Sequence, residues 1–251
     1  VNIEDLFKEL TDLFDKHPER YFRIGTGELA DSLSTDHITR YSPQLVTFFS
    51  KFPNALIELK TKTTLIENFI NEKHNGRTVV SWSLNTPQAI ATEEKEAPTL
   101  DERLQAAREC QNAGFKIGFH FDPMIYYSDW QNDYKMVIDQ VFEYINPESI
   151  IWISLGALRY PPHLDGIIRE RHPESNIVYG ELLPGIDGKF RYFKQIRIDM
   201  FKKMYQWIKA HNQNIFVYLC MESSEIWQKS FGWSPQNSSG LAKMMNALVR
   251  H

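Results

Sequence analysis

Apolar residues along this chain form short, mostly unbroken runs, which alternate with segments where they recur every three or four positions. The runs predict strands at 21–24, 55–60, 78–83, 115–120, 149–154 and 215–219. The recurring pattern predicts helices at 2–17, 37–52, 65–72, 99–113, 134–144, 164–171, 190–211 and 241–251. Strands that are apolar throughout are typical of a parallel sheet whose two faces are both covered.

The order of these segments indicates one domain over residues 1–251. No linker rich in Pro, Ser or Gly divides the chain, and no residue signature recurs from unit to unit. The simplest architecture is therefore α/β, as a barrel or partial barrel. Val1 is not a natural initiator, and we expect residues upstream of it to have been removed.

Composition narrows the class of protein. The formal net charge of −4 gives no general attraction to nucleic acid, although it leaves room for a local basic groove. No apolar run reaches the roughly 18 residues of a membrane span, and no signal peptide opens the chain, so we expect a cytoplasmic protein with no membrane partner. The two cysteines, Cys110 and Cys220, form no CxxC or zinc pattern.

Polar residues cluster where the predicted strands end. Gly25 and Gly27 let the backbone turn and approach a ligand closely, and Glu28 follows them at the end of the first strand. Ligands bind at the carboxyl ends of parallel strands, so these ends predict a site. Each residue also has a structural interpretation, such as a solvated lysine, a turn or a buried thiol. The set comprises Glu28, Asp31, Lys62, Ser83, Asn85, His120, Asp122, Ser154, Arg159, Cys220 and Glu222.

Within this set, His120 and Asp122 lie on one side of an extended segment. A metal or general-base role is conceivable for the pair, although a histidine in a hydrogen-bonded network is more common. The sequence contains no GxxxxGK[ST] and no HExxH motif, which removes the usual support for a nucleotide hydrolase or a zincin. Residues 25–30 fit a loose dinucleotide-binding pattern, but the acid inside the turn would repel a pyrophosphate.

The motifs taken in order resemble the spore photoproduct lyase family of radical S-adenosylmethionine (SAM) enzymes. The resemblance implies a partial (β/α)6 barrel that binds SAM and a [4Fe-4S] cluster. It also implies a 5′-deoxyadenosyl radical that abstracts hydrogen from a thymine dimer in DNA, with flavodoxin or ferredoxin as the reductant. The motifs are RIGTGELADS from Arg23, LKTK from Leu59, SWSLN from Ser81, GFHFDP from Gly118, WISLG from Trp152, GKFRY from Gly188 and YLCME from Tyr218.

The same resemblance assigns roles to residues of this chain. Glu28 would bind the SAM amino group beside Gly25 and Gly27, and Lys62 and Ser83 would contact its carboxylate and ribose, with Asn85 nearby. One anion and one cation suit a zwitterionic amino-acid group. The expected substrate-binding residues are Asp31, His120, Asp122, Arg191 and Tyr192, and the candidates for catalysis are Cys220 and Tyr192.

Two departures from the family pattern bear on function. The cluster motif CxxxCxxC is absent, so we expect it, together with the first barrel strand, upstream of Val1. This chain then holds no metal ligands, and alone it would be inactive. The family's hydrogen-donating cysteine is also absent, since this chain has Glu28-Leu29-Ala30 there, which favours a relative with another substrate. The alternatives are a non-catalytic barrel that binds a nucleotide or nucleic acid, and a metal-dependent barrel hydrolase centred on His120 and Asp122.

Overall fold

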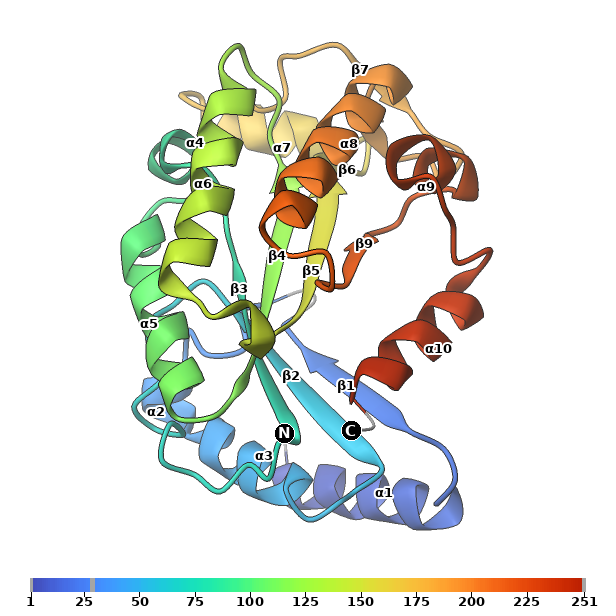
Figure 1. The fold of residues 1–251 in the computed structure, drawn as a ribbon. Coiled ribbons are helices and arrows are strands. Elements are labelled where there is room, and N and C mark those ends of the chain that lie inside the picture. Colours follow the sequence, from blue (N-terminus) through green and yellow to red (C-terminus); the bar gives the residue numbers. More distant parts are fainter. Residues whose placement is uncertain (1, 28–29, 250–251) are drawn as a thin grey trace.

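A single parallel sheet forms the centre of the molecule. The computed structural model describes residues 2–27 and 30–249. Six strands lie side by side in the order β1-β2-β3-β4-β5-β9, and every neighbouring pair is parallel. All six carboxyl ends therefore lie along one rim. Figure 1 shows the sheet curving as a partial barrel, which confirms the predicted architecture. The strands are β1 (Phe22–Thr26), β2 (Ala55–Thr61), β3 (Thr78–Ser83), β4 (Lys116–Met124), β5 (Ile150–Ala157) and β9 (Val217–Leu219).

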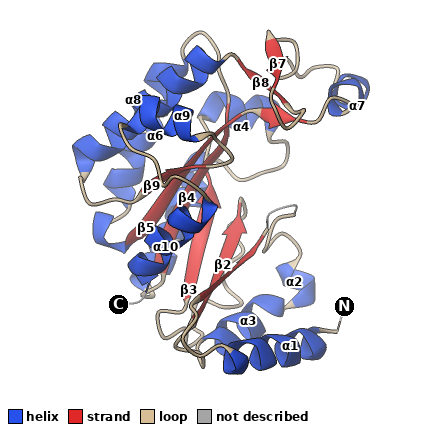
Figure 2. Cartoon of the chain, turned by 90° about the vertical axis from the view of Figure 1, so that its right-hand side faces the viewer, coloured by secondary structure: helices blue, strands red, loops and turns tan. Residues whose placement is uncertain are grey.

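Most helices cover the outer face of this sheet, as Figure 2 shows. The main apolar core lies between these helices and residues such as Ile57, Val80 and Phe119, which are fully buried. The helices are α1 (Ile3–Lys16), α2 (Asp36–Thr39), α3 (Tyr41–Phe49), α4 (Pro87–Glu93), α5 (Leu100–Asn112), α6 (Trp130–Tyr144), α7 (Leu164–Arg171), α8 (Lys194–His211), α9 (Ser224–Phe231) and α10 (Ser238–Val249), with a 3₁₀ turn, η1 (Pro147–Ser149). No helix in the described part of the chain is both long and apolar enough to cross a membrane.

The inner face of the sheet has its own small apolar cluster. Met245 and Val249 of α10 pack there against Leu56, Val79 and Trp152. Helix α10 is tied to β1 as well, because Arg23 Nε donates to Asn246 Oδ1 at 2.9 Å. The last helix of the described chain therefore fills the inner side of the half-barrel at the end opposite the rim.

A second, antiparallel sheet lies above the rim. It has the order β6-β8-β7, built from β6 (Arg159–Tyr160), β7 (Leu182–Pro184) and β8 (Phe190–Tyr192). The prediction of one helix over 190–211 was wrong in its first residues, since 190–192 pair as β8 and the helix begins at Lys194. Three-residue strands carry too short a pattern to be separated from an adjoining helix.

Two other predicted segments differ from the structure. The predicted helix 65–72 is a series of turns, where Thr63 N donates to Thr61 Oγ1 and Leu65 N to Thr63 Oγ1; such local bonds compete with a helix. The predicted helix 37–52 is broken at Arg40, which is left-handed (φ 49°), because Pro43 cannot continue a helix through this point. Pro87 begins α4, with Thr86 as its N-cap.

Candidate functional site

Polar side chains line the inner face of the sheet toward the rim. Because successive strand residues alternate between the faces, the residues that point inward on neighbouring strands come into one register. Ser83 of β3 is level with His120 of β4, which is level with Ser154 of β5, and that residue is level with Tyr218 of β9. Four strands therefore contribute a continuous row of hydrogen-bonding groups.

One largely buried carboxylate, Glu58, organises the middle of this face. Glu58 Oε1 accepts hydrogen bonds from Ser81 Oγ at 2.5 Å and from Trp152 Nε1 at 3.0 Å, and lies 2.8 Å from His120 Nε2. Burial opposes ionisation of this group, but the charge and hydrogen bond of His120 and the bonds from Ser81 and Trp152 outweigh it. Together they lower the pKa of Glu58 to about 2. Glu58 is consequently ionised at neutral pH.

The cluster around Glu58 depends on a glycine in the next strand. A Cβ atom at Gly118 would lie 2.3 Å from Ser81 Oγ and 2.7 Å from Trp152 Nε1. Only glycine leaves room for both donors to reach the carboxylate. Sequence reasoning missed Glu58, although a single acid in the middle of an apolar strand, Ala-Leu-Ile-Glu-Leu, was a signal that it has buried partners.

A cleft of about 330 Å³ opens at the carboxyl ends of β1 to β4. It brings together several residues that the sequence predicted as a site. Gly27 has φ +85°, and a Cβ there would lie 2.6 Å from Lys60 O, so the turn requires glycine. A Cβ at Gly25 would meet no atom within 4 Å. The residues that line the cleft are Gly27, Ala30, Asp31, Lys60, Thr61, Lys62, Ser83 and Asp122.

Asp31 fastens one wall of this cleft. Its Oδ1 accepts from the backbone N–H groups of Leu33 and Ser34 and from Thr61 Oγ1, and its Oδ2 accepts from Lys62 N at 2.6 Å. With both oxygens occupied by the chain itself, Asp31 joins the loop after β1 to the end of β2. Glu28, the acid predicted to act together with Lys62, lies outside the described residues.

Lys62 is held over the cleft by Glu94, the residue that caps the end of α4. Its Nζ lies 3.0 Å from Glu94 Oε1, and the other oxygen of Glu94 accepts from Arg103 Nη2 at 2.7 Å. Arg103 is fully buried and also donates to Ser83 O at 2.9 Å. The two predicted rim residues Lys62 and Ser83 are thus linked through Glu94 and Arg103.

Asn85 does not face open space. It is 2% exposed, donates to Pro123 O at 3.1 Å and accepts from Tyr134 Oη at 2.6 Å. These bonds fix the loop that follows β3 against the end of β4 and against α6. Asn85 therefore shapes the rim from beneath.

His120 and Asp122 turn to different partners. His120 pairs with Glu58, whereas Asp122 forms a two-pronged ion pair with Arg159 at 2.9 and 3.0 Å. Arg159 Nη2 also donates to Cys220 Sγ at 3.3 Å. Among the described residues, no three or more His, Cys, Asp or Glu side chains gather as a metal site. The hydrolase hypothesis therefore has no metal centre in the described part of the chain.

The remaining predicted residues lie on the small sheet above the rim. Arg191 pairs with Asp187, and Tyr192 Oη accepts from Tyr126 N at 3.0 Å. Burial raises the pKa of Tyr192 to about 12. Burial and the charge of Asp122 raise the pKa of Cys220 to about 12 as well, so both groups keep their protons at neutral pH.

A half-barrel of parallel strands with a polar cleft at their carboxyl ends defines a ligand-binding α/β protein of the partial-barrel class. A sequence profile described as "Spore photoproduct lyase" matches residues 1–222. The chain belongs to the spore photoproduct lyase family.

Two curated relatives carry the same family description. The chain is 23% identical over 208 residues to spore photoproduct lyase of Geobacillus sp. (strain Y412MC61), covering 82% of this chain and 59% of the relative. It is 22% identical over 214 residues to that of Bacillus subtilis (strain 168), covering 84% and 60%. The chain thus spans about 60% of the length of these curated relatives.

Two solved structures of spore photoproduct lyase mutants share the fold. One, with bound AdoMet and dinucleoside spore photoproduct, has a TM-score of 0.80, and another, with the dinucleoside photoproduct, has 0.81. Each is 20% identical in sequence, and the match covers 88% of this chain and 67% or 68% of the other chain. At this identity the likeness shows the fold.

Proposed function

We propose that this chain is the SAM-binding barrel of a radical SAM enzyme that acts on a cross-linked pyrimidine dinucleotide in DNA. The observation that carries the proposal is the polar cleft at the carboxyl ends of β1 to β4, in a chain that belongs to the spore photoproduct lyase family. A structure of that fold holds AdoMet and the dinucleoside photoproduct together, which is the ligand pair proposed for this chain.

The residues of the cleft suit the methionine part of SAM. Lys62, with 37% of its side chain exposed, supplies a cation for the carboxylate, and Ser83 supplies a hydroxyl at the next strand end. Glu28, which lies outside the described residues, is the proposed partner for the amino group, beside Gly25 and Gly27. The chemistry that bound SAM supplies in such enzymes is hydrogen-atom abstraction from the substrate.

The cysteines do not suit an iron–sulfur cluster. Cys110 is fully buried on α5, and burial raises its pKa far above the ordinary value, whereas Cys220 lies beyond β9. Two separated thiols cannot provide the usual cysteine ligands of such a cluster. The described residues therefore do not supply the cysteine ligands of such a cluster.

Within the described chain, Cys220 is the residue proposed to return a hydrogen atom to the substrate. Hydrogen-atom transfer requires the protonated thiol, and burial raises the pKa of Cys220 to about 12. Arg159 joins the thiol to Asp122, which lines the cleft. Tyr192 retains its proton too, but it lines a different pocket.

The test uses the full-length protein, reconstituted anaerobically with iron and sulfide and then reduced in the presence of SAM. We expect 5′-deoxyadenosine, and repair of an oligonucleotide that carries the dinucleotide photoproduct. Cys220→Ser should still form 5′-deoxyadenosine but lose repair by at least tenfold. Absence of 5′-deoxyadenosine from a cluster-loaded protein would exclude the enzyme class, and full repair by Cys220→Ser would exclude the donor assignment.

A further inference from the structure

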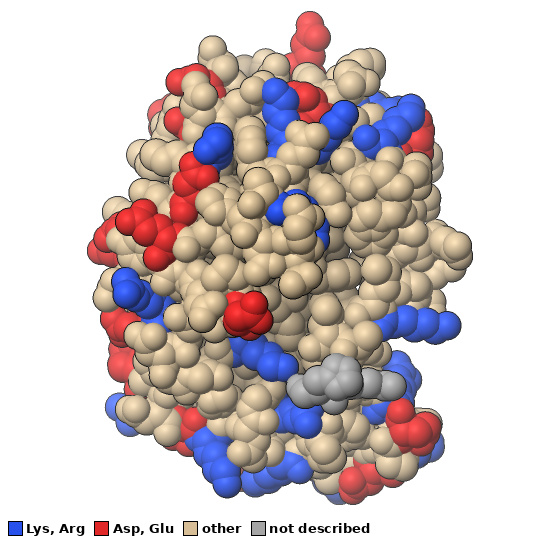
Figure 3. Space-filling view, viewed as in Figure 1, with Lys and Arg blue, Asp and Glu red and all other residues tan. Residues whose placement is uncertain are grey.

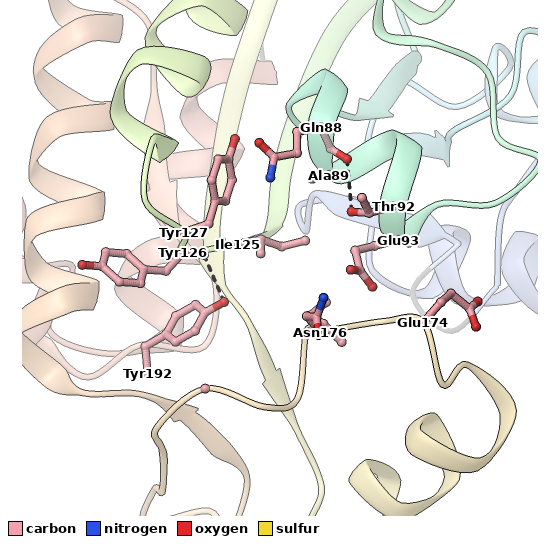
Figure 4. Close-up of a pocket in the computed structure, with 12 residues that line it drawn as sticks. Gln88, Ala89, Thr92, Glu93, Ile125, Tyr126, Tyr127, Glu174, Asn176 and Tyr192 are labelled. Carbon is pink, nitrogen blue, oxygen red and sulfur yellow. Dashed lines mark hydrogen bonds between the residues drawn. The ribbon is translucent and has the colours of Figure 1, made fainter.

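A second pocket lies beside the cleft, beyond the ends of β3 and β4. It encloses about 210 Å³ between α4, the segment after β4, and residues 174–180. In Figure 4, Gln88 and Glu93 extend from α4 toward the open space, Asn176 points into it from the opposite side, and Ile125 projects into it. Pockets for whole drug-sized ligands are larger, about 300–1,000 Å³, so this space suits one small planar ring.

The walls of this pocket offer free hydrogen-bonding groups. Glu93 Oε2 accepts from Ser175 Oγ at 2.5 Å, which orients the carboxylate and leaves Oε1 without a partner in the described chain. The side-chain amides of Gln88 and Asn176 likewise make no hydrogen bond to any described residue. Tyr192 Oη accepts from Tyr126 N and retains its own proton to donate. Donors and acceptors therefore both line one small space.

The charges of the pocket restrict its ligand. Among the described residues, no Lys, Arg or His lines it, and Glu93 and Glu174 both do, so an anionic group is not favoured inside. An adjoining hollow of about 360 Å³ shares Glu93 and Glu174 and adds Lys95 and His172, both of which pair with Glu174. A ligand with a neutral ring that carries N–H groups fits this distribution.

We propose that this pocket binds a single unpaired nucleobase carrying an amino group. Single-stranded bases are commonly read by side-chain amides and carboxylates along their hydrogen-bonding edge. The inference rests on the proposed function in one respect, namely that the nucleic-acid substrate is the source of the base. A free nucleotide has the same chemistry, and the experiment separates the two sources.

The position of the pocket suits a base close to a substrate that reacts beside the SAM cleft. Ser83 lines the cleft and Gln88 lines the pocket, only five residues further along the same segment. Asp122 of β4 lines the cleft, and Ile125, just after that strand, lines the pocket. The pocket therefore adjoins the cleft, where a base next to the reacting dinucleotide can bind while SAM occupies the cleft.

The test measures the affinity of the full-length protein for single-stranded hexanucleotides by fluorescence anisotropy. Each strand carries the photoproduct at its centre, with adenine, cytosine or an abasic residue on either side. The double variant Gln88→Ala/Asn176→Ala is compared with Gln105→Ala, an exposed amide on α5. Free dAMP and dCMP are titrated separately, and SAM binding is measured for every variant as an independent check of the cleft.

We expect the abasic residue on one side to weaken binding about five- to tenfold, as loss of one or two hydrogen bonds would. The affinity of the double variant for the adenine strand should fall by the same factor, so that the variant no longer distinguishes adenine from the abasic residue. Gln105→Ala should behave as wild type. Saturable dAMP or dCMP binding that the double variant loses also supports the pocket, even if no strand binds and the DNA proposal fails. Equal affinity for all strands, with no nucleotide binding that the double variant removes, would overturn the inference.

Discussion

Glu58 shows how one residue determines the inner face of the half-barrel. A carboxylate buried in this way is stable only when several donors compensate for the water it has lost. Ser81, His120 and Trp152 do so from three different strands, and Gly118 leaves the space that they need. The carboxylate therefore connects β2 to β5 through side chains, in addition to the backbone ladder.

Replacing this carboxylate should lower stability in a pH-dependent way. Folding depresses the pKa of this carboxyl from 4.5 to about 2. The carboxylate therefore stabilises the fold at pH values above 4.5, and this contribution is lost as the pH falls toward 2. Glu58→Gln should reduce the free energy of unfolding at pH 7 by on the order of 2–3 kcal/mol. It should also flatten the decline of that free energy between pH 4.5 and 2, measured by urea unfolding.

The matched control for this prediction is Glu67→Gln, an exposed carboxylate in the β2–β3 connection. It should leave both the free energy of unfolding and its pH dependence unchanged. If the free energy of unfolding of Glu58→Gln falls between pH 4.5 and 2 as steeply as that of wild type, then the Glu58 cluster does not account for the acid sensitivity.

At the scale of elements, the loop after β1 is held to β2 by Asp31. This residue was predicted to bind substrate, but in the structure its oxygens accept four hydrogen bonds from the chain itself. The loop and the strand end both line the cleft. The shape of the cleft therefore depends on a carboxylate that need not touch the ligand.

Asp31→Asn tests this clamp. One side-chain oxygen becomes an NH₂ group and faces a backbone donor, so the bond from Lys62 N or the bonds to Oδ1 are lost. We expect the amide protons of Leu33 and Lys62 to exchange about tenfold faster, measured by NMR hydrogen exchange. Asp12→Asn, on the exposed face of α1, serves as the control; equal protection in both variants would show that Asp31 is no clamp.

Helix α10 is the second element whose role the structure clarifies. Met245 is 5% exposed against the inner face of the sheet, whereas its neighbour Met244 is 38% exposed. Met245→Ala should cost about 2–3 kcal/mol of unfolding free energy, and Met244→Ala less than about 0.5 kcal/mol, in thermal or urea unfolding. Similar losses for the two would mean that α10 does not pack on the inner face as described.

At the scale of the whole molecule, the sequence predicted the sheet well because each of the six strands contains or adjoins a short, mostly apolar run. It missed β6, β7 and β8, since strands of two or three residues depend on tertiary pairing. It also missed α9, whose cap Ser223 was the available signal.

Prediction of the site was limited in another way. The pattern identified the rim, but it could not distinguish residues that face the cleft, such as Lys62, from buried residues whose side chains are hydrogen-bonded within the protein, such as Asn85. That difference arises from partners distant in sequence, including Arg103 and Tyr134. The net charge of −4 likewise did not show how charges are distributed. On the face drawn in Figure 3, basic and acidic side chains are interspersed.

The central claim is that the cleft at the ends of β1 to β4 binds SAM. The most direct measurement is equilibrium dialysis of labelled SAM against the anaerobically reconstituted full-length protein and two lysine variants. We predict saturable binding to wild type, at least tenfold weaker binding to Lys62→Ala, and wild-type binding to Lys73→Ala, an exposed lysine away from the cleft. No saturable binding to wild type, or the same affinity for Lys62→Ala as for Lys73→Ala, would contradict the claim.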